Sequence, residues 1–188
     1  MREGKLCDNV MAIFVTTSER DFDFSPFLDV FDSVVWEIND SLSDVSYGEI
    51  RRIWGEEFWR EKILDFEFKF LPNAFCQTNS YCAQELYRFV AGIVDGGKTL
   101  VDAYAGIGSF GFILSDKFEK VIGIEESEQS IESFHINKSE IGVKNYEMIR
   151  GRVEDVLKTL KFDILLLDPP RAGVHPKVAE AINRYRPK

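Results

Sequence analysis

The sequence predicts an α/β fold whose main part is a doubly wound parallel sheet, preceded by a small α+β subdomain. Two observations favour the parallel sheet. Short apolar segments alternate with helical patterns from about residue 99 onward, and two of these segments end in motifs rich in glycine or proline. Short β and α elements in alternation are typical of βαβ units, whose helices cover both faces of the sheet. Before residue 72, alternating polar and apolar residues indicate a separate unit of mixed structure.

The length and charge of the chain limit what it can bind. A chain of 188 residues can form one domain with a smaller appendage. The net charge is −9, and residues 1–100 hold 18 acidic and 10 basic residues. Such an acidic excess argues against binding nucleic acid by general electrostatics. A basic cluster near the end of the chain could contact phosphate or form a solvated helix face: Arg171, Lys177, Arg184, Arg186 and Lys188.

The cysteines and the hydropathy of the chain predict a cytoplasmic protein. No apolar run is long enough to cross a bilayer, so no membrane partner is expected. The N-terminal residues MREGKLCDNV have no signal-peptide pattern. Cys7, Cys76 and Cys82 are odd in number and follow no metal-binding spacing. We therefore expect reduced thiols and no metal site.

Residues 1–72 are expected to form the small α+β subdomain. The β-branched segment at 10–17 predicts a strand, and the alternating segments at 49–54 and 65–70 predict half-buried antiparallel strands. Ser25 followed by Pro26 is typical of a helix start, with Ser25 as N-cap. The segment VVWEIN at 34–39 could extend that helix or form a strand.

Residues 73–188 are expected to form the main domain. Its first helix spans 79–94, with Asn79 or Ser80 as cap and Gly96-Gly97 as the stop signal. The pattern then predicts strands at 99–104, 120–125, 146–150 and 162–167, and helices at 108–117, 127–141, 153–160 and 175–185.

Three of the predicted strands end in an acidic residue: Asp102, Glu125 and Asp168. In an open parallel sheet, ligands bind just beyond the carboxyl ends of the strands, and a nucleoside cofactor fits there. The residues from Gly106 to Gly111 also match the pattern G-x-G-x-x-G of dinucleotide-binding proteins. This match alone is weak evidence, because Gly106 and Gly108 could simply form a tight turn.

The position of Asp102 favours one nucleoside over another. A carboxylate just before the glycine-rich turn would repel a pyrophosphate but attract the amino or sulfonium group of S-adenosylmethionine. Glu125 could accept the ribose hydroxyls of that cofactor or of a dinucleotide, or it could be a solvated acid. Asp168 is followed by two prolines, which hold it rigidly at the sheet edge. We therefore favour S-adenosylmethionine over a nicotinamide or flavin dinucleotide.

Three segments resemble one family of enzymes. They are FLPNAFCQTNS at 70–80, DAYAGIGSF at 102–110 and DPPRAGVHP at 168–176. In this order and spacing they are similar to motifs of the RNA 5-methyluridine methyltransferases, which methylate uracil C5 in tRNA and ribosomal RNA. The resemblance implies a Rossmann-like methyltransferase sheet, S-adenosylmethionine as cofactor and RNA as partner. It also implies which residues form the cofactor and target-base site: Gln77, Tyr104, Glu125 and Asp168, with Ser109 near the methionine end, in addition to Asp102, Gly106 and Gly108.

Members of this family use a nucleophilic Cys that lies one strand beyond the helix after the Asp-Pro-Pro-Arg motif. The resemblance therefore places the nucleophile beyond Lys188, and no catalytic residue is expected within these 188 residues. The sheet is expected to be incomplete at its C-terminal end, which would leave the 162–167 strand with an open edge and favour self-association. Within the 102–110 motif the chain differs from the family's usual pattern at two positions. Ala105 replaces a usual Cys, and Ser109 stands where Asn or Thr is commoner.

Two other functions remain open. Methyltransferases that act on a purine amino group need no Cys and share Asp/Asn-Pro-Pro, but an aromatic residue usually follows, and here Arg171 follows. The acidic charge and the absent nucleophile would also suit a non-catalytic cofactor-binding module.

Overall fold

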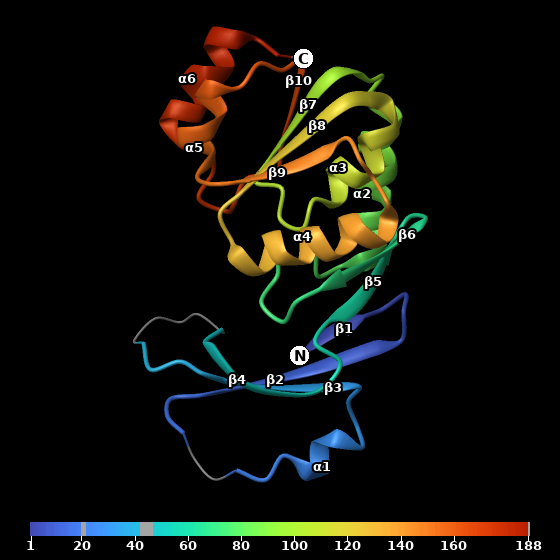
Figure 1. The fold of residues 1–188 in the computed structure, drawn as a ribbon, viewed down its shortest axis with the longest axis vertical. Coiled ribbons are helices and arrows are strands. Elements are labelled where there is room, and N and C mark those ends of the chain that lie inside the picture. The colour runs from blue at the N-terminus through green and yellow to red at the C-terminus, as the bar shows by residue number, and fades with distance from the viewer. Residues whose placement is uncertain (20–21, 42–46, 188) are drawn as a thin grey trace. The chain divides into compact units, whose positions relative to one another are not determined.

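A computed structural model describes residues 1–19, 22–41 and 47–187. The chain divides into two compact units, Met1–Asn73 and Ala74–Lys188, which we call the first and second unit (Figure 1). Within the described residues, no helix has both the length and the apolar character needed to span a bilayer.

The first unit contains a four-stranded mixed sheet and a separate hairpin. The sheet has the order β1-β2-β3-β4, in which only β2 and β3 run parallel. The elements are β1 (Arg2–Gly4), β2 (Asn9–Thr16), α1 (Ser25–Leu28), β3 (Ser33–Ile38), β4 (Glu49–Gly55) and the hairpin strands β5 (Trp59–Ile63) and β6 (Phe66–Phe70). The predicted α+β character of this unit is therefore confirmed, and so are the strands at 10–17, 49–54 and 65–70. The strands β1 and β5 were not predicted.

The predicted helix at Ser25 is a single turn that ends before the VVWEIN segment. Its N-cap is Phe24 rather than Ser25, and the carboxylate of Asp23 accepts a hydrogen bond from the Ser25 amide at 2.9 Å. The segment forms β3 instead of extending the helix. Its Val34 and Val35 are completely buried between β2 and β4, where β-branched side chains pack well.

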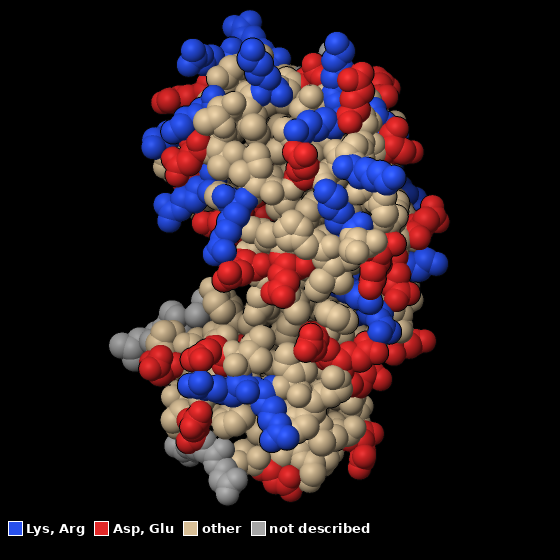
Figure 2. Space-filling view, in the orientation of Figure 1, with Lys and Arg blue, Asp and Glu red and all other residues tan. Residues whose placement is uncertain are grey.

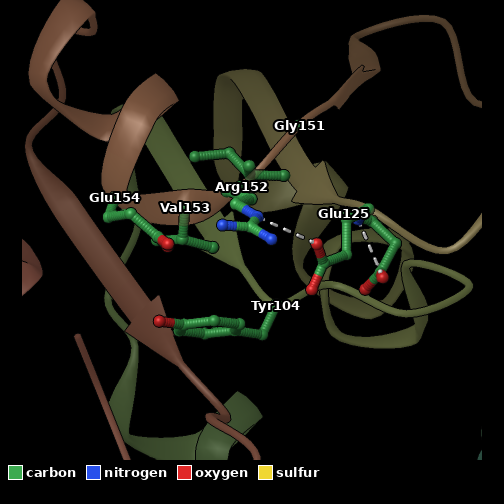
Figure 3. A pocket seen from close by; sticks show the side chains of 8 residues that line it. Tyr104, Glu125, Gly151, Arg152, Val153 and Glu154 are labelled. Atoms are coloured by element: carbon green, nitrogen blue, oxygen red, sulfur yellow. Dashed lines mark hydrogen bonds and ion pairs between the residues drawn. The ribbon is translucent and has the colours of Figure 1, made fainter.

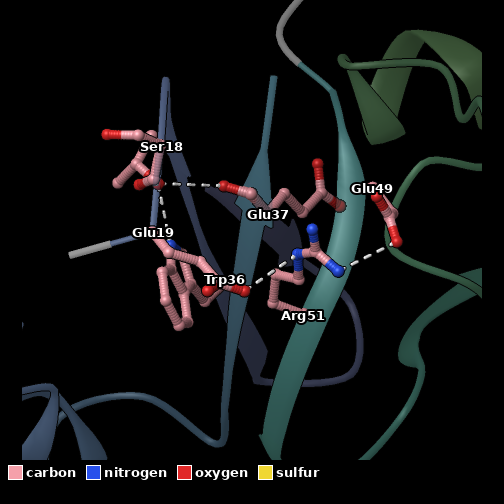
Figure 4. Close-up of polar contacts among 7 residues, drawn as sticks. Ser18, Glu19, Trp36, Glu37, Glu49 and Arg51 are labelled. Carbon is pink, nitrogen blue, oxygen red and sulfur yellow. Dashed lines mark hydrogen bonds and ion pairs between the residues drawn. The ribbon is translucent and has the colours of Figure 1, made fainter. Parts of the chain in front are cut away.

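Polar side chains form contacts on β2, β3 and β4 and in the segment after β2 (Figure 4). The Trp36 indole donates a hydrogen bond to the Thr16 hydroxyl at 2.9 Å. Arg51 forms ion pairs with Glu49 at 3.1 Å and with Glu19 at 3.6 Å. Because both glutamates are exposed, these ion pairs contribute little to stability, and the packing of apolar side chains holds the sheet together.

The second unit is a doubly wound α/β domain, as predicted. Its sheet has the order β10-β7-β8-β9, and all of its strands run parallel. The strands are β7 (Gly97–Ala103), β8 (Phe118–Glu125), β9 (Tyr146–Arg150) and β10 (Ile164–Leu167). The helices are α2 (Ser80–Ile93), α3 (Ser109–Leu114), α4 (Glu128–Ile141), α5 (Val153–Val156) and α6 (Pro176–Tyr185), with single 3-10 turns η1 (Ser115–Lys117) and η2 (Leu157–Thr159). Figure 1 shows α5 and α6 on one face of the sheet and α3 and α4 on the other.

Alternate side chains of the central strands fill the core on each side of this sheet. On the α5 and α6 face, residues of β7 and β8 pack against residues of the helices and η2: Val101, Ala103, Ile122 and Ile124 against Val153, Leu157, Val178 and Ala181. On the other face, the rings of Phe112, Phe134 and Tyr146 pack together. Burial on both faces explains the nearly continuous apolar runs of these strands.

Two boundaries differ from the predicted ones for identifiable reasons. The last strand begins at Ile164 rather than 162, because the Asp163 carboxylate accepts hydrogen bonds from the amides of Lys98 and Thr99 at the start of β7. The helices predicted at 108–117 and 153–160 each end early in a 3-10 turn. The predicted cap of α2 is confirmed, since the Asn79 side chain accepts a hydrogen bond from the Cys82 amide.

Candidate functional site

A pocket opens at the carboxyl edge of the second unit's sheet, where β7, β8 and β9 end. It is lined by Tyr104, Ile124, Glu125, Glu126, Gly151, Arg152, Val153 and Glu154. Figure 3 shows the ring of Tyr104 on one side of this pocket and Arg152 on the opposite side. The lining residues lie at the end of β8 or in the segments that directly follow β7, β8 and β9, which is where open α/β sheets bind ligands.

The Glu125 carboxylate is held in place by backbone amides. Its Oε2 accepts a hydrogen bond from Gly106 N at 2.8 Å, and its Oε1 accepts from Glu126 N at 2.9 Å and Ser127 N at 2.8 Å. A carboxylate offers about four lone-pair positions, so one acceptor position remains, on Oε2. Glu125 therefore ties the turn after β7 to the turn after β8 and can still accept one hydrogen bond from a ligand.

The turn after β7 has an unusual backbone. Tyr104 has φ +63°, which is uncommon for a residue with a side chain, and Gly106 and Gly108 have φ +57° and +85°. This conformation places the Tyr104 ring against the pocket, and burial raises the pKa of its hydroxyl. Left-handed conformations of non-glycine residues, such as that of Tyr104, often occur at ligand sites. Because Gly106 and Gly108 also have positive φ angles, both predicted glycines lie where a residue with a side chain would be strained.

The opposite side of the pocket was not predicted. Arg152 forms an ion pair with Glu126 at 3.7 Å across the pocket (Figure 3). Val153, the first residue of α5, also lines the pocket, but it is 3% exposed and belongs mainly to the core. The rule that ligands bind just beyond the carboxyl ends of parallel strands, which predicted Glu125, could also have predicted this side. Gly151 and Arg152 directly follow the predicted strand at 146–150.

Asp102 lies beneath the glycine-rich turn and is 1% exposed. Its Oδ2 accepts hydrogen bonds from the Tyr146 hydroxyl at 3.0 Å and from the Gly111 amide at 3.1 Å. Burial, with smaller contributions from the Asp168 and Glu125 carboxylates, raises the pKa of Asp102 to about 7, although its two hydrogen bonds lower it. The sequence suggested a ligand cation as the partner of Asp102, whereas the structure gives it two partners from within the protein.

Tyr146 explains why glycine is needed at two positions, Gly108 and Gly111. A Cβ added at Gly108 would lie 2.8 Å from the Tyr146 hydroxyl, and one at Gly111 would lie 2.2 Å from its Cζ. The ring is fully buried between Phe112 and Phe134, so it cannot move aside. Tyr146 was not predicted as part of the site.

Gln77 and Asp168 meet at a second position on the carboxyl edge. The Gln77 side-chain amide donates a hydrogen bond to the Asp168 carboxylate at 3.3 Å, although 91 positions separate them. Burial raises the pKa of Asp168, while this hydrogen bond opposes the rise. The proximity of Gln77 and Asp168, which rested on the family resemblance, is confirmed.

Ser109 is nearly buried at the start of α3. Its hydroxyl is 2.8 Å from the Tyr87 hydroxyl of α2, and the ring of Tyr87 packs against Phe110. Of the eight residues predicted for the site, Tyr104 and Glu125 line the pocket directly. The backbone amide of Gly106 donates a hydrogen bond to Glu125. Asp102, Gly108 and Ser109 are not among the residues that line this pocket.

The parallel sheet, the acidic residue that ends β8 and the glycine-rich turn after β7 define a Rossmann-like domain of the nucleoside-binding class. The chain belongs to the tRNA (uracil-5-)-methyltransferase family, whose model matches residues 56–161, more than half of the chain.

Relatives and solved structures agree with this family. The chain is 41% identical to the tRNA (uracil(54)-C(5))-methyltransferase of Pyrococcus abyssi and 39% identical to that of Pyrococcus furiosus, with all of this chain and 45% of each relative covered. It is similar, with TM-score 0.86 and 40% identity, to the crystal structure of the Pyrococcus abyssi enzyme in complex with S-adenosyl-L-homocysteine, covering 99% of this chain and 46% of that one. The chain thus spans a little under half the length of these relatives.

Proposed function

We propose that the chain is the cofactor-binding part of an RNA methyltransferase that transfers a methyl group from S-adenosylmethionine to C5 of a uracil in tRNA. The membership of the family and the position of Glu125 at the pocket support this proposal. The similar Pyrococcus abyssi enzyme, which is named for uracil 54 of tRNA, was solved with the demethylated form of this cofactor. The three free cysteines suit the reducing compartment, the cytoplasm, that we also propose.

The lining of the pocket fits an adenosine. The Tyr104 ring offers an aromatic face for a purine, while the other apolar lining residues, Ile124 and Val153, are almost completely buried behind the pocket. The remaining lone pair on the Glu125 Oε2 can accept one ribose hydroxyl. The second ribose hydroxyl would have to compete with a backbone amide for Glu125, so we expect one strong hydrogen bond there rather than two.

The bound cofactor supplies an electrophilic methyl group. The residues of this chain orient that methyl group and the target base relative to each other. Gln77 and Asp168 present an amide and a carboxyl group side by side, and such groups match the donors and acceptors on the edge of a uracil. The two prolines after Asp168 keep its carboxyl group at the sheet edge.

The Glu125→Ala substitution is expected to weaken binding of S-adenosylhomocysteine by about 1.5–3 kcal/mol. This is the usual contribution of a hydrogen bond to a charged group, and the substitution also frees the Gly106 amide that shapes the turn. Isothermal titration calorimetry on the 188-residue chain measures the effect. Glu119→Ala, which removes an exposed carboxylate from the opposite end of the same strand, is the matched control.

Two results would contradict the proposed function. One is the absence of any heat of binding when the folded wild-type chain is titrated with S-adenosylhomocysteine. The other is tighter binding of a nicotinamide dinucleotide, because its pyrophosphate would have to sit near the Asp102 and Glu125 carboxylates.

We also propose that the open side of β10 allows the chain to associate with itself. Within the described part of the second unit, β10 is paired only with β7 and lies at the edge of the sheet. Its residues Ile164–Leu167 are apolar and half-buried, and an apolar strand edge is a template for pairing. We expect light scattering to detect oligomers at micromolar concentration. A monomer whose amides at 164–167 nevertheless exchange slowly would show that another segment covers this edge.

A further inference from the structure

The last 20 residues differ in charge from the rest of this acidic chain. They contain five Lys or Arg residues and one acidic residue, Glu180. In Figure 2, Lys and Arg side chains gather over the part of the second unit that contains α6. Arg171, Lys177, Arg184 and Arg186 are all exposed, and none has a carboxylate within ion-pair distance among residues 1–19, 22–41 and 47–187. By contrast, Arg60, Arg88 and Lys120 are each paired with a glutamate.

These four cations, which we call the track, follow one another from the loop after Asp168 to the end of α6. Arg171 lies in the loop after Asp168, at the carboxyl edge of the sheet. Lys177 is in the first turn of α6 and Arg184 is two turns further on the same side, about 10 Å away along the helix axis. Arg186 follows the end of the helix. The buried side of α6 carries Val178 and Ala181, so the cations lie on the solvent side.

The stability of the helix does not account for this arrangement. The positive end of the helix dipole disfavours a cation in the first turn, where Lys177 lies. Arg184 and Arg186 are favourable at the other end of the helix. Glu180 lies on the same face between Lys177 and Arg184 and lowers the local positive charge, but it forms no ion pair with either of them. An unpaired row of cations in a chain of net charge −9 indicates an anionic partner that is itself a row of charges.

We infer that the track formed by Arg171, Lys177, Arg184 and Arg186 binds the phosphate backbone of the substrate RNA and leads it to the site. This inference rests on the proposed function. Phosphates repeat regularly along a nucleic-acid strand. The cations along a helix of this length can therefore contact two or three successive phosphates. Such contacts position the RNA without reading its sequence.

The experiment measures binding of an unmodified tRNA transcript to the 188-residue chain by fluorescence anisotropy at several KCl concentrations. In the variant Lys177→Gln/Arg184→Gln/Arg186→Gln, the slope of log K against log[KCl] is expected to fall by about two units. The affinity at low salt is expected to fall by about tenfold or more. The control Arg60→Gln/Arg88→Gln/Lys120→Gln removes three paired cations, so it gives the same net charge and is expected to change the slope little.

Each outcome decides the inference. Equal losses in the two triple variants would overturn it, because net charge alone would then control binding. An absence of salt-dependent binding by the wild-type chain would also overturn it. If the triple variant does not fold, Lys177→Gln alone is used, since it removes a cation that the helix dipole disfavours, and its slope is expected to fall by about 0.7–0.9. Titration of the same variants with S-adenosylhomocysteine tests the proposed function separately and is expected to give unchanged affinity.

Discussion

Replacing Gly111 with alanine is expected to lower the free energy of unfolding by about 3 kcal/mol or more. The added Cβ would lie 2.2 Å from Cζ and 2.4 Å from Cε1 of Tyr146, far inside van der Waals contact. Overpacking of a core commonly costs about 1–3 kcal/mol, and here the obstacle is a fully buried ring rather than the end of a flexible side chain. Urea denaturation, followed by circular dichroism, measures this loss.

Gly92 provides a matched control in helix α2. A Cβ at this position meets nothing within 4 Å, and its backbone is ordinary helix. Gly92→Ala is therefore expected to stabilise the protein by about 0.5–1 kcal/mol, because alanine favours the helix more than glycine does. If Gly111→Ala unfolds at the same urea concentration as the wild type, the ring of Tyr146 does not lie where the structure places it. Combining Gly111→Ala with Tyr146→Leu should recover part of the loss.

The central part of the fold could be predicted from local patterns. The strands β7 and β8 are apolar and bounded by turns, and α2 has a capping residue, Asn79, at its start. Such signals lie within a few residues of the element that they specify. The segment at 34–39 was ambiguous because its β-branched residues also fit a helical extension, and only its place between β2 and β4 decides for a strand.

The site was predicted less completely, because its chemistry depends on contacts between distant segments. The role of the glycines beneath the turn requires Tyr146, which follows Gly111 by a helix and a strand. Nothing near Tyr146 in the sequence indicates this contact. The pair Gln77 and Asp168 was expected from the family resemblance alone. Asp102 was correctly placed on its strand, but its hydrogen-bond partners could not be predicted, because one of them is Tyr146 on β9, two strands away in the sheet.

The buried carboxyl group of Asp102 should make the protein less stable as the pH rises. In the folded protein the pKa of Asp102 is raised to about 7, mainly by burial, while an unfolded chain has an Asp pKa of about 3.9. The folded state therefore binds this proton more tightly. The stabilising contribution is complete below about pH 4 and is lost as the pH rises through about 7, up to a total of about 4 kcal/mol.

The Asp102→Asn variant isolates this contribution. Asparagine has nearly the same shape and keeps an oxygen that can accept hydrogen bonds from Gly111 N and the Tyr146 hydroxyl, but it carries no charge to bury. Urea denaturation is expected to show a stabilisation by Asn, relative to the wild type, that is about 2–3 kcal/mol larger at pH 8 than at pH 5, because part of the loss has already occurred between about pH 4 and pH 5. Comparing the two proteins at each pH cancels the titration of other groups, including Glu37 and Asp168, whose pKa values are also raised.

A companion variant tests the cause of the shift. Tyr146→Phe removes a hydrogen bond that lowers the pKa of Asp102, so the loss of stability with pH should become larger and extend to higher pH. In the Asp102→Asn background the same change should no longer alter the pH dependence, because no carboxyl group is left to titrate. A difference between wild type and Asp102→Asn that stays constant from pH 5 to pH 8 would mean that this carboxyl group keeps an ordinary pKa. Its place beneath the glycine-rich turn would then have to be more hydrated than its contacts indicate.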